Sequence, residues 1–253
     1  MTKSFENTAE FRNASFRHID LSGSVFRGCD VNDVKIVGCD VNNLRVDGHL
    51  GRAGRVIVDG IDVTDYVAAE LDRQFPELAR LEQLTTADDF RTLWGTTKRV
   101  WDETIERARR LPQTALNKRV DGEWSFVETL RHLVFATDVW IGRMIRNVEL
   151  PFASIGLPSF EYSDADARAI GIDLSASPPL DDVIAVHLDR RAQMDAELAG
   201  LDDARMDESR TFAPEPVVGV ESATIRDCLF TVIEEHLLHR RYAVRDLKVL
   251  ETG

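Results

Sequence analysis

The chain has no apolar run that approaches the roughly 20 residues of a membrane-spanning helix, so we expect no transmembrane segment. Its N-terminus, MTKSFENTAEF, is too polar for a signal peptide. Cysteine is scarce, with three residues in 253, which excludes the disulfide framework of a small secreted domain. These absences favour a cytoplasmic protein whose cysteines are small core residues.

Basic residues are fewer than acidic residues. The sequence has 31 Lys and Arg residues against 44 Asp and Glu residues, and its formal net charge is −13. A chain of this charge repels phosphate backbones, and nucleic-acid binding would need a concentrated basic patch, which the sequence does not contain. We therefore expect no nucleic-acid partner and no membrane partner. With 253 residues the chain is long enough for two domains.

An apolar residue occupies every fifth position from residue 11 to residue 46. Two positions before each of them stands another residue that is small or aliphatic. Neither a helix nor a strand has a period of five, whereas a short fixed period with two inward residues per unit is typical of a solenoid. The first set is Phe11, Phe16, Leu21, Phe26, Val31, Ile36, Val41 and Val46, and the second is Ala9, Ala14, Ile19, Ser24, Cys29, Val34, Cys39 and Leu44.

These units resemble the pentapeptide-repeat family, whose right-handed β-helix has four sides and takes four units per coil. The resemblance implies two coils, with Phe11 stacked over Val31 and Phe16 over Ile36. Two coils form a short stub with two apolar ends, which the same chain or another chain has to cover. We predict such a pentapeptide-repeat β-helix stub, with an irregular end, over residues 1–62. A homodimer is one way to cover an exposed end.

Helical patterns occupy the rest of the chain. Residues 56–63 are predicted to form a short hairpin or a last irregular coil, and residues 63–85 a helical cap and linker with an amphipathic helix at 65–75. Four longer helices are predicted at 88–110, 125–147, 180–201 and 224–250, separated at 148–179 by a long crossover loop of the kind that is often functional. We predict a mixed, two-part fold: the short β-helix, then an all-α four-helix bundle over residues 86–253.

The last predicted helix carries an inward stripe at steps of four and three residues. Two members of this stripe, Glu235 and His239, are one turn apart and can direct a ligand atom each at one metal ion, and His132 on the second helix can supply a third. Three ligands leave positions open to water or substrate, as in a catalytic metal site. The stripe consists of Cys228, Val232, Glu235, His239, Tyr242 and Asp246.

Spacing alone leaves alternatives to this triad. His236 and His239, three residues apart, form a rival chelating pair. A Glu-x-x-x-His pair is also common as a solvated contact between helical turns. We expect His187, in the acidic third helix, to lie on the surface.

Two segments, EWSFVETLRHLV at residues 123–134 and EHLLHRRY at residues 235–242, resemble the DinB/YfiT-like superfamily, which includes mycothiol-dependent maleylpyruvate isomerase. The resemblance implies a four-helix bundle that holds a divalent metal, commonly zinc or nickel, through three residues. Its Trp-x5-Leu-x-His pattern matches His132, and its Glu-x3-His pattern matches Glu235 and His239. His236 falls between the ligand positions, which implies a place beside the site.

For function, the resemblance implies a low-molecular-weight thiol as co-substrate, bound to the metal as thiolate. We therefore expect a metal-dependent thiol S-transferase or isomerase that acts on a small-molecule substrate. Tyr242 is a candidate hydrogen-bond donor to a bound ligand, and Arg240 is a candidate for binding a carboxylate, although such an arginine more often lies on the solvated face of a helix. The alternative is a noncatalytic interaction or dimerisation protein that uses its repeats. The sequence assigns no catalytic residue.

Overall fold

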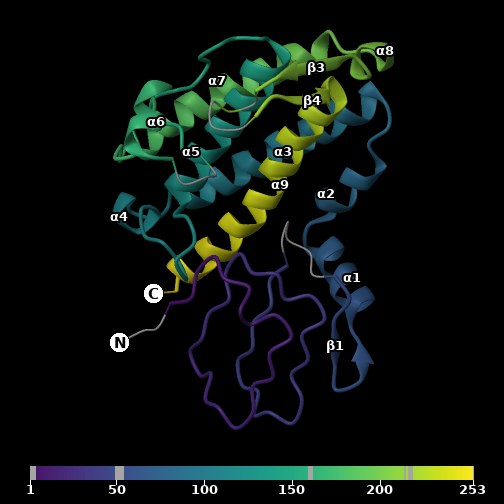
Figure 1. The fold of residues 1–253 in the computed structure, drawn as a ribbon. Coiled ribbons are helices and arrows are strands. Elements are labelled where there is room, and N and C mark those ends of the chain that lie inside the picture. Colours follow the sequence, from purple (N-terminus) through teal and green to yellow (C-terminus); the bar gives the residue numbers. More distant parts are fainter. Residues whose placement is uncertain (1–3, 49–53, 159–161, 214, 216–218, 253) are drawn as a thin grey trace.

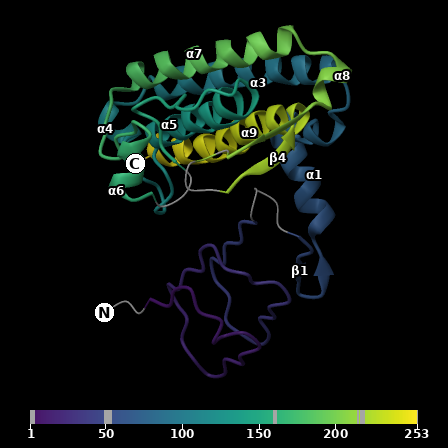
Figure 2. The same ribbon diagram turned by 45° about the horizontal axis from the view of Figure 1, so that its top comes forward.

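A computed structural model describes residues 4–48, 54–158, 162–213, 215 and 219–252. Figures 1 and 2 show an N-terminal coil, which we call the repeat segment (residues 4–48), and a helical region that follows it. The helical C-terminal region predicted from the sequence is confirmed.

The repeat segment turns a corner at every fifth residue. Its backbone is left-handed at each corner, with φ between 54° and 73°. Glycine adopts this conformation without a Cβ clash, and asparagine, aspartate and histidine tolerate it better than other residues. The five-residue period of the sequence is therefore also a period of the backbone. The corner residues are Asn13, His18, Gly23, Gly28, Asp33, Gly38 and Asn43.

The structure does not show the predicted β-helix in the repeat segment. Residues 4–48 contain no strand, and the eight apolar residues at the five-residue period are 41–68% exposed. Phe11 packs on its neighbours, with its ring centroid 5.0 Å from that of Phe5 and 5.9 Å from that of Phe16. With two coils, each inward residue has at most one other coil to stack on. An isolated stub therefore buries little apolar surface to offset the entropy of ordering it.

A hairpin and two helices connect the repeat segment to the helical core. Strand β1 (Ile57–Val58) pairs antiparallel with β2 (Ile61–Asp62), and α1 (Thr64–Gln74) follows. Helix α2 (Pro76–Ala79) begins at a proline, which suits the first position of a helix because an N–H there has no intrahelical partner. A 3-10 turn, Leu81–Gln83, leads into the core. The predicted hairpin and the predicted helix at 65–75 are confirmed.

Four long helices of the described chain enclose the core: α3 (Ala87–Ala108), α5 (Phe126–Thr137), α7 (Leu180–Ala199) and α9 (Ile225–Leu250). They lie side by side in Figures 1 and 2, and both α7 and α9 pack on α3 and on α5. Large apolar side chains fill the space between them. Those that are almost fully buried include Phe90, Trp94, Trp101, Leu130, Leu133, Val183, Leu229 and Leu237.

Three of these helices start at a capping box, with Thr86, Ser125 or Thr224 as the cap. In α5 the Ser125 hydroxyl accepts from the Glu128 N–H, and the Glu128 carboxylate accepts from the Ser125 N–H at 2.8 Å. Both exchanges satisfy backbone donors that the first helical turn leaves without partners. The caps fix where α5 and α9 begin, and so which residues they turn inward.

Shorter elements link the long helices. Helix α5 continues into a π-helix, Asp138–Ile145, and the crossover to α7 contains α6 (Asp164–Ala169). Helix α4 (Gln113–Leu116) lies between α3 and α5. Between α7 and α9 lie α8 (Asp203–Met206) and the antiparallel strands β3 (Ser209–Phe212) and β4 (Glu221–Thr224). Among the described residues, no helix is both long enough and apolar enough to cross a membrane.

Candidate metal centre

Helices α5 and α9 bring His132, Glu235 and His239 together. One possible ligand atom from each residue lies within 4.8 Å of the other two. His132 is buried on α5, whereas Glu235 and His239 are partly buried, one turn apart on α9. The spacing of four residues puts the two α9 side chains on one face, and α9 packs on α5. The structure thus gathers the three residues that the sequence singles out as metal ligands.

Glu235 stands between the two imidazoles. Its Oε2 atom lies 3.3 Å from His132 Nε2 and 3.1 Å from His239 Nδ1. Burial alone would raise the pKa of Glu235, but the contacts with His132 and His239 outweigh burial and hold the pKa well below its usual range. The carboxyl group is therefore ionised at neutral pH, which is the form that binds a metal ion.

The protonation of His132 follows from its neighbours. Its Nδ1 lies 3.1 Å from the Leu157 carbonyl oxygen, and because a carbonyl can only accept, Nδ1 carries a hydrogen and donates it. Burial lowers the pKa of His132 in spite of the nearby Glu235, so the ring is neutral and Nε2 holds a lone pair. That nitrogen lies 3.3 Å from the Glu235 carboxylate. A neutral ring has one hydrogen for two neighbouring acceptors, and a cation shared by Nε2 and the carboxylate would serve both.

His239 has its Nδ1 beside Glu235. This nitrogen lies 2.9 Å from the Glu235 backbone carbonyl oxygen, which can only accept, and 3.1 Å from the Glu235 carboxylate, so Nδ1 is the donor and Nε2 is the nitrogen left to bind a metal ion. Two imidazole nitrogens and one carboxylate oxygen are a donor set that suits zinc or nickel. The residues present therefore fit a divalent metal ion.

Aromatic rings pack against the two histidines. The Trp124 ring lies 4.5 Å from the His132 ring and stacks on the His239 ring at 5.9 Å, with an angle of 22° between the latter planes. Tyr242 meets the His239 ring edge-on at 6.0 Å. Burial raises the pKa of Tyr242, so its hydroxyl keeps its hydrogen at neutral pH. Tyr242 thus stays a candidate hydrogen-bond donor.

His236 lies apart from this group. Its Nδ1 donates to the Val232 carbonyl at 2.7 Å, and its Nε2 faces His187 Nε2 at 3.2 Å. The ring also meets the Trp94 ring edge-on. The structure therefore joins His236 to α7 and α3 rather than pairing it with His239. The expectation that His187 is exposed is wrong, because the acidic residues of α7 lie on other faces and this one turns inward.

Arg240 also faces away from the triad. Its Nε donates to the Val100 carbonyl and to the Thr104 hydroxyl, each at 3.1 Å, and its Nη1 pairs with Glu77. These contacts tie α9 to α3 and α2. The geometry gives no support to the prediction that Arg240 binds a substrate carboxylate.

Two groups at the site were not singled out as functional from the sequence. Trp124 belongs to the Trp-x5-Leu-x-His pattern, and its place directly before the Ser125 cap is the signal that points to it. The Leu157 carbonyl comes from the crossover. Every residue has a backbone carbonyl, so no sequence pattern indicates which carbonyl contacts the site.

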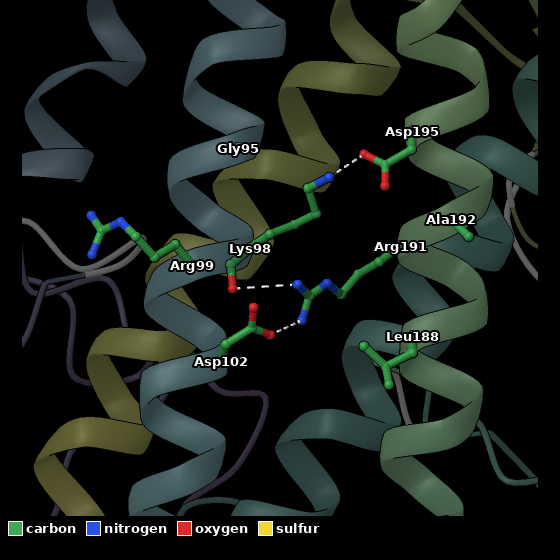
Figure 3. Close-up of a pocket in the computed structure, with 8 residues that line it drawn as sticks. All are labelled: Gly95, Lys98, Arg99, Asp102, Leu188, Arg191, Ala192 and Asp195. Carbon is green, nitrogen blue, oxygen red and sulfur yellow. Dashed lines mark hydrogen bonds and ion pairs between the residues drawn. The ribbon is translucent and has the colours of Figure 1, made fainter.

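A hollow of about 390 Å³ lies between α3 and α7. Figure 3 shows Lys98, Asp102, Arg191 and Asp195 converging across it, whereas Arg99 points away. Lys98 pairs with Asp195 at 2.5 Å and Arg191 with Asp102 at 2.7 Å, so these opposite charges are already matched. The described residues that line the hollow do not include the triad.

Comparison with protein-family models matches residues 96–243 to the DinB superfamily, a stretch that contains His132, Glu235 and His239. Residues 9–43 match eight copies of the pentapeptide repeat. Neither the curated proteins nor the solved structures include a match to the chain.

Proposed function

The chain belongs to the DinB superfamily, and we propose that it binds one divalent metal ion through His132, Glu235 and His239 and uses it in thiol chemistry. The observation that carries this proposal is the convergence of the three residues, whose possible ligand atoms lie within 4.8 Å of one another, with His132 Nε2 3.3 Å from the Glu235 carboxylate. A partly buried carboxylate beside a buried imidazole has lost part of its hydration, and a shared cation offsets that cost.

A bound divalent ion lowers the pKa of a coordinated thiol and so supplies a thiolate nucleophile at neutral pH. The three ligands hold it, Trp124 packs on both imidazoles, and we propose that the hydroxyl of Tyr242, whose ring meets that of His239, donates to a bound small molecule. The activity we propose is S-transfer or isomerisation of a small-molecule substrate with a low-molecular-weight thiol. Such a thiol and three free cysteines both suit a reducing, cytoplasmic compartment.

Metal analysis of the purified protein tests the metal site. We expect about one zinc or nickel ion per chain, and its loss in His132→Ala, Glu235→Gln and His239→Ala. Glu234→Gln is the matched control, because Glu234 is the neighbouring half-buried carboxylate on α9 and lies outside the triad. Full metal content in all three triad variants would rule out the assignment.

Thiol binding is tested on a cobalt-substituted sample. A thiolate that enters the coordination sphere changes the visible spectrum of cobalt. We expect at least one of mycothiol, bacillithiol, glutathione and coenzyme A to produce this change at millimolar concentration. If none does, and no electrophilic acceptor is consumed in their presence, the thiol part of the proposal fails while the metal site can still stand.

A second function is supported by a separate observation, the exposure of the apolar residues in the repeat segment. We propose that this segment closes into its β-helix, with those residues inside, when a partner such as a second copy of the chain covers an apolar end of the coils. Sedimentation velocity of the wild type and of Phe16→Asp tests this. We expect a dimer that the variant loses, with Arg17→Ala as the control. Monomers in all three samples would contradict self-association.

A further inference from the structure

Arg131, the residue before His132 on α5, is buried, and its guanidinium donates to three backbone carbonyls of the crossover. The contacts are from Nε to Ile155 at 2.7 Å, from Nη1 to Ala176 at 2.6 Å and from Nη2 to Asp173 at 3.2 Å. Burial lowers the pKa of Arg131. Burying a guanidinium costs free energy, and a planar fork of donors offsets that cost only when its acceptors are held in matching positions.

The crossover is joined to two consecutive residues of α5. The Leu157 N–H donates to the Arg131 carbonyl at 3.2 Å, and the Leu157 carbonyl accepts from His132 Nδ1 at 3.1 Å. The Ile155 carbonyl, two residues earlier, accepts from the Arg131 side chain. A Cβ at the intervening Gly156 would lie 3.1 Å from the Ala153 carbonyl oxygen, so this stretch passes its neighbours closely.

The position of the Leu157 carbonyl matters because it decides which nitrogen of His132 carries the hydrogen. While the carbonyl is in place, Nδ1 keeps the hydrogen and Nε2 offers its lone pair to a metal ion. If the carbonyl moves away, the ring loses its anchor, and its hydrogen can move to Nε2 and bond to Glu235. Partners that orient a ligating histidine in this way typically change metal affinity by about 10–100-fold when they are removed.

We propose that Arg131 is a positioning residue for the metal centre: by clamping the carbonyls of the crossover, it holds the Leu157 carbonyl against His132 and keeps His132 Nε2 free for the metal ion. This inference rests on the proposed metal site. It adds a residue that touches neither the ion nor its ligands' donor atoms.

Arg131→Met and Arg143→Met form a matched pair for the test. Arg143 is a buried arginine of the π-helix that also donates to backbone carbonyls, from Nε to Ala213 at 2.6 Å and from Nη1 to Glu149. Its loss removes a comparable clamp at a distance from His132 along the helix. Metal affinity is measured by competition with a chelator, beside the melting temperature of each variant. We expect Arg131→Met to lose about 10–100-fold in affinity, and Arg143→Met to stay within about twofold of the wild type.

A second readout needs no metal. Long-range ¹H–¹⁵N spectra of the metal-free protein report which imidazole nitrogen carries the hydrogen. We expect His132 to be the Nδ1–H form in the wild type and in Arg143→Met, and a mixture of forms in Arg131→Met. If the wild type binds no metal, the proposed function fails but this readout still decides the role of Arg131.

Arg131→Lys is a second variant for the case that Arg131→Met does not fold. Lysine keeps the charge but cannot reach three carbonyls at once. We expect an intermediate loss of affinity and a partial change of the His132 form. Wild-type metal affinity together with an unchanged Nδ1–H form in the folded variants would overturn the proposal. So would equal losses in Arg131→Met and Arg143→Met.

Discussion

Backbone carbonyls set the hydrogen-bonding roles of the buried histidines. His132 donates from Nδ1 to Leu157 and His236 donates from Nδ1 to Val232, which leaves each Nε2 with a lone pair. For His236 the facing atom is His187 Nε2 at 3.2 Å; burial lowers the pKa of both rings, and a hydrogen on His187 Nε2 would complete a neutral pair. For His132 it is the carboxylate of Glu235, which at neutral pH has no hydrogen to give. The two histidines therefore share the same donor role at Nδ1, but only His132 has a carboxylate at its second nitrogen, which is where we propose that the metal ion binds.

Asp138 is a buried carboxylate for which we predict a pH dependence of stability. It pairs with Arg190 and accepts from the Ala153 N–H at 2.8 Å. Burial raises its pKa to about 6, although Arg190 acts in the opposite direction. Because this pKa lies above the value of about 3.9 in an unfolded chain, the folded protein binds the proton more tightly. The contribution of Asp138 to stability is then fully present below about pH 4 and is lost as the pH rises through about 6, a change of roughly 3 kcal/mol.

Urea unfolding from about pH 4 to about pH 7 measures this effect in the wild type and in Asp138→Asn. The unfolding free energy should fall less steeply with pH in the variant. Asp189→Asn is the control, because Asp189 also contacts Arg190 but is exposed, and hydrogen bonds lower its pKa. Identical slopes in the wild type and Asp138→Asn would show that Asp138 does not titrate in this window.

At the scale of the elements, apolar spacing and caps predict the long helices, but they do not predict where the helical geometry changes. The predicted helix at 125–147 is found as α5 followed by the π-helix. A π turn shifts the apolar face of a helix around its axis. Nearly every residue of α5 is buried, so the sequence shows no separate apolar face in which such a shift could be seen. Strands β3 and β4 have four residues each and mix polar with apolar side chains, so they lack the alternation that marks a strand.

Two glycines in long helical segments should respond in opposite ways to alanine. A Cβ at Gly142, in the π-helix, would lie 2.5 Å from the Pro151 Cβ, whereas a Cβ at Gly95, in α3, meets nothing within 4 Å. We expect Gly142→Ala to destabilise the protein by about 1–3 kcal/mol through overpacking. Gly95→Ala should stabilise it by up to about 1 kcal/mol, since alanine loses less conformational entropy in a helix. Thermal unfolding checks both, and a stabilised Gly142→Ala would show that Pro151 does not pack on the π-helix.

At the scale of the whole molecule, periodicity predicts the corners of the repeat segment but not the stacking of its coils. A left-handed residue every fifth position follows from where Gly, Asn and Asp stand, whereas stacking depends on what covers the ends. The candidate metal centre is also only partly predictable from the sequence. Helical spacing and motif predict His132, Glu235 and His239, while the contacts of Arg131 and Leu157 come from the crossover, whose path no periodicity encodes.

The repeat segment meets the helical region at the turn before Trp124. Arg27 donates to the Glu123 carboxylate at 2.7 Å and to the Asp121 carbonyl at 3.2 Å, and Arg45 pairs with the Asp121 carboxylate at 2.8 Å. The turn is tight, with left-handed backbone at Asp121 and at the next residue. Since the Trp124 ring packs on His132 and His239, these two arginines are connected to the candidate metal centre through only a few residues.

Removing both arginines, in the double variant Arg27→Ala/Arg45→Ala, should loosen this turn. The reporter is the Glu123 N–H, which donates to the Val120 carbonyl at 2.9 Å and whose hydrogen exchange measures opening of the turn. An exposed ion pair contributes about 0.2–1 kcal/mol, so we expect exchange to quicken by only a few-fold and the effect to shrink at high salt. Arg17→Ala is the control, because that side chain bonds to Ser15 within the repeat segment. Equal exchange in the double variant and the control would mean that the turn keeps its shape, and Trp124 its place over the histidines, without help from the repeats.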